Sequence, residues 1–198
     1  MLSPRRFAQL GLGAAIMLAV ASMATIFIRP LVLSRPMAFA EPGTPAPLFK
    51  LSDPDGRSLY LGDLHGQVAI LYFTSIHCPD CAAYNSRIQA LANRYRNEPR
   101  VRFVAINIDP NVDPVAVRVD AKIVGRSFPT LLDVKSEIAT LYSVKSTPQI
   151  AVIDPQGTLR YRGPFDDNST EKSVTHRYVA ETLSALLTNR ELAFSTGD

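Results

Sequence analysis

The 198-residue chain contains only two cysteines, Cys78 and Cys81. A β-rich run over residues 67–74 leads into this pair, and a long helical pattern follows it. The cysteines are therefore expected at the first turn of a helix, where unpaired N–H groups and the helix dipole stabilise a thiolate. Pro79 fits the first helical position, because its missing N–H costs nothing there. The spacing predicts a redox-active dithiol with Cys78 as the helix cap.

The pair has two other interpretations, a structural disulfide and a metal site. A structural disulfide that closes a loop of four residues contributes only about 2 kcal/mol, against about 3 kcal/mol for a loop of 15 residues. A metal site is the second alternative, because two thiolates and the adjacent His77 could hold copper or zinc. These three ligands have no second cluster elsewhere and would leave a structural site incomplete. Redox chemistry is favoured, no metal is assigned, and a copper-binding metallochaperone stays as an alternative.

The elements that must position the pair can also be read from the sequence. The residues Cys81, Tyr84, Ile88, Leu91 and Tyr95 recur at steps of three and four, which predicts one buried helix face. The apolar run over residues 101–108 is nearly continuous and suits a central strand. Strand, helix and strand in this order predict a right-handed crossover and a parallel pair.

The rest of the domain shows weaker but readable patterns. Residues 109–126 are the least readable; a helix from Pro114 to Ile123 is expected, either as an insertion over the active-site end or as a connector. Asp166 and Asp167 are expected to be solvated in a polar loop. The other expected elements are a hairpin of residues 48–51 and 57–60, an apolar segment 128–133, helices at 135–142 and 174–187, and an antiparallel hairpin of residues 149–153 and 158–161.

The N-terminus predicts a membrane anchor. Leu10 to Ile28 is uncharged and mostly apolar, follows Arg5 and Arg6, and is long enough to cross a bilayer. Residues 37–40 resemble a signal-peptidase site, so export to the periplasm with cleavage near Ala40 is the alternative. We expect an uncleaved anchor in the inner membrane, with the domain on the periplasmic face. The predicted division is an anchor and proline-rich linker over residues 1–44, and a redox domain over residues 45–198.

Charge excludes nucleic acid as a partner. Residues 1–40 hold four arginines and no acidic residue, which leaves 17 of the 21 basic residues against all 18 acidic ones. The basic pI of about 9.0 therefore belongs to the N-terminal segment. The domain itself is nearly neutral and shows no basic surface of the kind that nucleic acid requires.

Four features together resemble the thioredoxin superfamily and, within it, exported redoxins of the peroxiredoxin-like branch. They are the strand that leads into His77–Cys81, the segment 128–133, Thr147-Pro148 before a strand, and the hairpin of residues 154–162. The resemblance covers most of residues 45–190. It implies an α/β thioredoxin-like fold with a central mixed sheet flanked by helices.

The resemblance also implies roles for individual residues. Cys78 would be the attacking thiolate, and Cys81 the resolving thiol that closes on the mixed disulfide. Pro148 would be a cis proline against the cysteine pair, and the backbone of Thr147 would pair with an extended substrate. An X-Pro bond is cis in only about 5% of cases, so this expectation rests on the resemblance.

The sequence departs from the superfamily at several positions. His77 stands where thioredoxins have Trp, and Tyr72 replaces a buried acid, so the proton acceptor for Cys81 is missing or comes from elsewhere. Leu71 and Ser75 replace the Pro and Thr of peroxiredoxins, which weighs against a thiol peroxidase, the third hypothesis.

Three residues are expected to tune the site. They are His77, Pro79 and Asp80, of which the imidazolium would lower the pKa of Cys78 and the carboxylate would raise it. An acid between the cysteines favours a reductant over a strong oxidant.

The expected reaction is thiol–disulfide exchange with a protein dithiol or disulfide in the periplasm. It needs no bound cofactor, and a membrane electron donor would recharge the reductant.

Overall fold

The computed structural model describes residues 39–193 and 195–196. The predicted membrane segment from Leu10 to Ile28 lies outside these residues. Within the described part of the chain, no helix has the length and apolar character to cross a membrane.

A five-stranded mixed sheet forms the centre of the domain, in the order β5-β4-β3-β6-β7. The central strand β3 pairs in parallel with β4 and antiparallel with β6, and all seven of its residues are buried. The predicted parallel pair and the antiparallel C-terminal hairpin are thereby confirmed. The strands of this sheet are β3 (Val68–Thr74), β4 (Val101–Asn107), β5 (Thr130–Leu132), β6 (Gln149–Ile153) and β7 (Leu159–Gly163).

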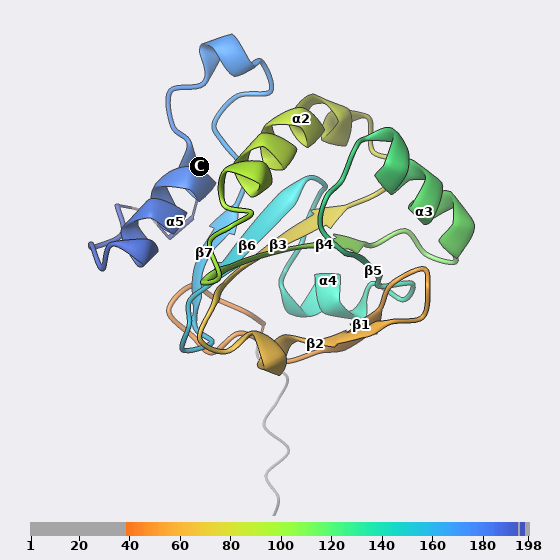
Figure 1. Ribbon diagram of the computed structural model, residues 1–198, viewed down its shortest axis with the longest axis horizontal. Coiled ribbons are helices and arrows are strands. Elements are labelled where there is room, and N and C mark those ends of the chain that lie inside the picture. Colours follow the sequence, from red (N-terminus) through yellow and green to blue (C-terminus); the bar gives the residue numbers. More distant parts are fainter. Residues whose placement is uncertain (1–38, 194, 197–198) are drawn as a thin grey trace, which may run out of the picture. The chain divides into compact units, whose positions relative to one another are not determined.

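Helices cover both faces of this sheet (Figure 1). One face carries α2 and α5, and the other carries α4 and the β1–β2 hairpin. The alternation of β3 explains the two layers, because Ile70 and Tyr72 point toward α2 while Leu71 and Phe73 point to the opposite side. The covering elements are β1 (Lys50–Ser52), β2 (Ser58–Tyr60), α2 (Pro79–Arg94), α4 (Glu137–Leu141) and α5 (Tyr178–Leu187).

Two predicted helices differ in how well they match the structure. The helix expected after Asp113 is present as α3 (Pro114–Ile123), and the Asp113 side chain caps it by accepting the N–H of Val115. The last helix begins at Tyr178 and not at Val174. Residues 174–177 are not helical, so the expected first turn of the last helix was wrong; a 3-10 turn (η2, Glu171–Ser173) precedes them.

The folded domain also begins earlier than predicted. Residues up to 44 were expected to form a linker, yet Ala40 is only 1% exposed. Its N–H donates to the carbonyl of Leu141, and the N–H of Gly43 donates to that of Leu159. Because these hydrogen bonds join it to the rest of the domain, the segment from Ala40 onward is part of the packed unit.

Three segments meet at one end of the central strands. Thr74 at the end of β3 pairs with Asn107 at the end of β4, because the two strands are parallel. Gln149, at the start of the antiparallel β6, lies opposite Phe73 at the same end of the strands. Three segments therefore meet at this end. They are the segment from β3 to Cys78, the segment from β4 to Asp109, and the segment from Pro148 into β6.

Candidate redox site

The cysteine pair lies at the N-terminus of α2, as the sequence predicts. Cys78 is the N-cap residue, and its sulfur accepts the backbone N–H of Cys81 at 3.0 Å. Pro79 occupies the first turn, where its missing N–H leaves no donor unpaired. The two cysteines form a disulfide with their Cα atoms 5.4 Å apart. After reduction, the same N–H and the helix dipole would stabilise a thiolate on Cys78.

The two sulfurs differ in accessibility. Cys78 is half-buried, whereas Cys81 is only 3% exposed. A reaction partner would therefore reach Cys78 before Cys81. This asymmetry is what a pair with one attacking and one resolving cysteine requires.

A cis peptide bond joins Thr147 and Pro148 beside the pair. The cis state implied by the resemblance is thus found in the structure. The carbonyl oxygen of Thr147 lies 3.2 Å from the sulfur of Cys78 and would accept a hydrogen bond from its thiol. Both Thr147 and Pro148 are half-buried, so part of this segment remains accessible next to the sulfur.

The three expected tuning residues lie at the rim of the site. His77, Pro79 and Asp80 are all exposed. Solvent and salt screen charges at such positions. The opposing charge effects of His77 and Asp80 on Cys78 are consequently expected to be small.

Tyr72 lies where a buried acid would stand in thioredoxins. Its hydroxyl donates to the side-chain oxygen of Asn85 at 3.2 Å and accepts from the hydroxyl of Thr74 at 3.1 Å. Asn85 lies four residues after Cys81, on the same face of α2. Burial raises the pKa of the Tyr72 phenol. A hydrogen-bonded tyrosine, with the Arg126 guanidinium 5.8 Å from its ring centroid, thus stands where thioredoxins have a carboxylate.

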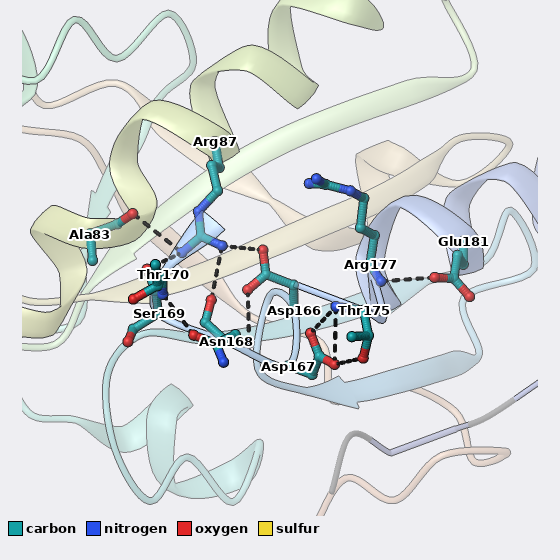
Figure 2. Close-up of polar contacts among 10 residues, drawn as sticks. All are labelled: Ala83, Arg87, Asp166, Asp167, Asn168, Ser169, Thr170, Thr175, Arg177 and Glu181. Atoms are coloured by element: carbon teal, nitrogen blue, oxygen red, sulfur yellow. Dashed lines mark hydrogen bonds and ion pairs between the residues drawn. The ribbon is translucent and has the colours of Figure 1, made fainter. Parts of the chain in front are cut away.

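A buried ion pair fastens the segment after β7 to helix α2 (Figure 2). The Arg87 guanidinium donates to Asp166 at 2.5 Å and to the carbonyls of Asn168 and Ser169, both at 3.0 Å. The side chains of Arg87 and Asp166 are 4% and 0% exposed. The prediction of a solvated Asp166 was therefore wrong: a polar loop can bury a carboxylate when a distant helix supplies a cation.

Sequence reasoning also missed Asp109, which contacts the turn before Cys78. Its position directly after a strand that ends beside β3 was a usable signal, because polar groups gather at the carboxyl ends of parallel strands.

Asp167, the neighbour of Asp166, is partly exposed and accepts hydrogen bonds from Thr175, as drawn in Figure 2. Across the described residues, no group of three or more His, Cys, Asp or Glu side chains is arranged to hold a metal ion.

Comparison with known proteins places this geometry in a family. The profile of the AhpC/TSA family matches residues 42–162, which span the cysteine pair and the cis proline. The chain belongs to the AhpC/TSA family.

Several individual proteins are similar to this chain. The thiol-disulfide oxidoreductase ResA of Bacillus subtilis is 31% identical over 117 residues, which cover 58% of this chain and 63% of that protein. An uncharacterized conserved protein of Geobacillus kaustophilus shares 29% identity with a TM-score of 0.72, over 79% of this chain and 87% of its own. A secreted disulfide oxidoreductase of Mycobacterium tuberculosis, described as homologous to DsbE, shares 25% identity with a TM-score of 0.50, over 56% and 79%. The fold is thus the α/β thioredoxin-like fold that was expected.

Proposed function

We propose that this protein is a thiol-disulfide oxidoreductase that acts on other proteins through Cys78 and Cys81. The observation that carries the proposal is the accessible Cys78 sulfur at the cap of α2, with the Cys81 N–H at 3.0 Å and the Thr147 carbonyl at 3.2 Å. In the reductive direction, the Cys78 thiolate attacks a substrate disulfide and releases one substrate thiolate. Cys81 then attacks the mixed disulfide and releases the second. Two electrons pass to the substrate, and the enzyme keeps the disulfide.

We also propose a direction of electron transfer and a cellular location for this protein. A reducing role is the direction we propose, although the exposed Asp80 next to the pair adds only a small effect, and a membrane electron donor would then return the enzyme to its dithiol form. The anchor of residues 1–44 and the periplasmic location rest on the sequence of the N-terminus. The buried position of Ala40 supports retention of the residues up to the expected cleavage point, because Ala40 is itself part of the packed domain. N-terminal sequencing of the protein from a membrane fraction tests this: a chain that begins at Glu41 would contradict it.

Trapping of reaction intermediates tests the roles of the two cysteines. The variant Cys81→Ser should accumulate mixed disulfides with protein substrates, because nothing resolves them, whereas Cys78→Ser should trap none. Wild-type protein should also speed the reduction of insulin by dithiothreitol. Equal trapping by the two variants would contradict the assignment, and absence of insulin reduction would contradict the activity.

A further inference from the structure

Asp109 is a buried carboxylate beside the redox turn that the reaction described above does not use. It is 9% exposed and lies two residues after the end of β4. Within the described part of the chain, no Lys, Arg or His forms an ion pair with it. A buried charge without a counter-ion persists only if hydrogen bonds compensate for lost hydration.

The compensating hydrogen bonds come from the turn that precedes Cys78. One carboxylate oxygen of Asp109 accepts the hydroxyl of Ser75, and the other accepts the backbone N–H of Ile76 at 2.8 Å. The side-chain amide of Asn107 donates a further hydrogen bond at 2.9 Å. Hydrogen bonds to a charged acceptor are about twice as strong as neutral ones. Asp109 therefore fixes two consecutive residues of this turn.

The same contacts extend to the residue before Cys78. The Ser75 hydroxyl oxygen, which donates to Asp109, also accepts the N–H of His77 at 3.0 Å. The N–H of Cys78 donates to the Ser75 carbonyl at 3.3 Å. A continuous set of hydrogen bonds thus runs from the carboxylate to the backbone on both sides of His77. Since Cys78 caps α2 only if its backbone is extended, this turn determines where its sulfur lies.

We propose that Asp109 is a positioning residue of the redox site, which holds the turn before Cys78 in its capping conformation and places its carboxylate against Ser75 and Ile76, in the turn that leads to the thiolate. The inference rests on the proposed redox function of Cys78. The charge opposes the thiolate, whereas the dipole of α2 favours it. Asp109 would therefore keep the thiolate less stable than the helix alone would make it, which suits a reductant. The other ionisable groups of the turn, His77 and Asp80, are exposed and screened by solvent.

The first test is Asp109→Asn in the full chain, which keeps the size of the side chain and removes its charge. In the reduced protein, the ratio of thiolate to thiol at Cys78 should rise about threefold to tenfold at a given pH, the size expected for one charge across a partly buried site. The pH dependence of iodoacetamide alkylation measures this ratio. The equilibrium with dithiothreitol should shift in the same sense toward the dithiol form, and a tenfold shift corresponds to about 30 mV.

Asp154→Asn is the control. Asp154 is also a buried carboxylate, 4% exposed, and accepts the N–H groups of Gln156 and Thr158, but unlike Asp109 it also forms an ion pair with Arg160 at 3.1 Å. It follows β6, which is antiparallel to β3. Asp154 therefore lies beside the start of β3, at the opposite end of the strands from Cys78. This variant should lose stability and leave both redox readouts unchanged.

Ser75→Ala separates the hydrogen bonds from the charge and serves if Asp109→Asn does not fold. It removes one donor to the carboxylate and the acceptor of the His77 N–H, and it keeps the charge. The less compensated charge should lower the thiolate ratio at Cys78, opposite to the effect of Asp109→Asn. Should either variant fold and reproduce the wild-type alkylation profile and dithiothreitol equilibrium, Asp109 has no positioning role. Both readouts concern the cysteine pair alone, so failure of insulin reduction would refute the proposed function and leave this test intact.

Discussion

Tyr72 matters at the scale of single residues, because it occupies the position at which thioredoxins carry a buried acid that could accept a proton. Its hydroxyl donates to Asn85 and accepts from Thr74, and burial raises its pKa. A phenol in this state cannot serve as a base near neutral pH. We therefore expect that Tyr72 does not accept the proton of Cys81.

Tyr72→Phe tests whether this hydroxyl is structural only. The variant should lose about 1–2 kcal/mol of stability, because Asn85 and Thr74 lose a buried partner. The rate and pH profile of insulin reduction should stay within about twofold of wild type. Tyr142→Phe is the control, since it removes a comparable hydroxyl that donates to the carbonyl of Pro47 at 2.9 Å on the other face of the sheet. A loss of activity in Tyr72→Phe alone would give the phenol a role in proton transfer.

At the scale of elements, helix α2 connects the redox site to the segment after β7. Its N-terminus holds the cysteine pair, and Arg87, about two turns further, binds Asp166 and the carbonyls of Asn168 and Ser169. The guanidinium also stacks on the ring of Tyr84, 4.3 Å from its centroid. One buried cation thus fixes both the helix and the loop beside it, which accounts for an arginine on the buried face.

Arg87→Met should cost about 3–5 kcal/mol of stability at pH 7, because it leaves the Asp166 carboxylate buried without its cation. Arg94→Met, an exposed arginine on the same helix, is the control and should cost less than about 0.5 kcal/mol. Chemical denaturation followed by circular dichroism measures both. A loss below 1 kcal/mol in Arg87→Met would mean that the ion pair contributes little.

The cost of Arg87→Met should also depend on pH. Burial already raises the pKa of Asp166 above its usual value, while Arg87 opposes this shift. Without the cation the folded-state pKa rises further above the unfolded value, so the folded state binds a proton more tightly and its stability falls as pH rises through that pKa. The deficit relative to wild type should therefore be smaller at pH 4 than at pH 7, and an equal deficit at both would contradict this account.

The sequence was most informative where local rules decide the structure. The capping position of Cys78, the start of α3 after Asp113 and the parallel pairing of β3 with β4 all follow from local chemistry or short-range topology. The pairing of Arg87 with Asp166, 79 residues away, does not, because no local pattern marks which loop approaches which helix. The helical stripe likewise gave no reason to bury an arginine.

The described domain is stabilised mainly by its two apolar layers, and the disulfide adds little. The sheet is packed on both faces, and the cysteine pair closes a loop too short to contribute much chain entropy. A redox enzyme needs this arrangement, because its fold must persist in both oxidation states.

Reduction with dithiothreitol should accordingly change the free energy of unfolding by only about 2 kcal/mol. Denaturation followed by circular dichroism or tyrosine fluorescence suits the measurement, because the chain has no Trp. A reduced protein that unfolds, or loses more than about 4 kcal/mol, would show the bridge to be structural.

The account as a whole rests on the thiolate at the cap of α2, and alkylation of the reduced wild-type protein tests it most directly. Iodoacetamide labelling at a series of pH values, with each cysteine quantified by mass spectrometry, gives the reactivity of Cys78 and Cys81 separately. We expect Cys78 to react first, with a half-reaction pH below the usual value of about 8.5 for a free thiol, and Cys81 to stay protected. Equal reactivity of the two, or a Cys78 that titrates like a free cysteine, would contradict the central claim.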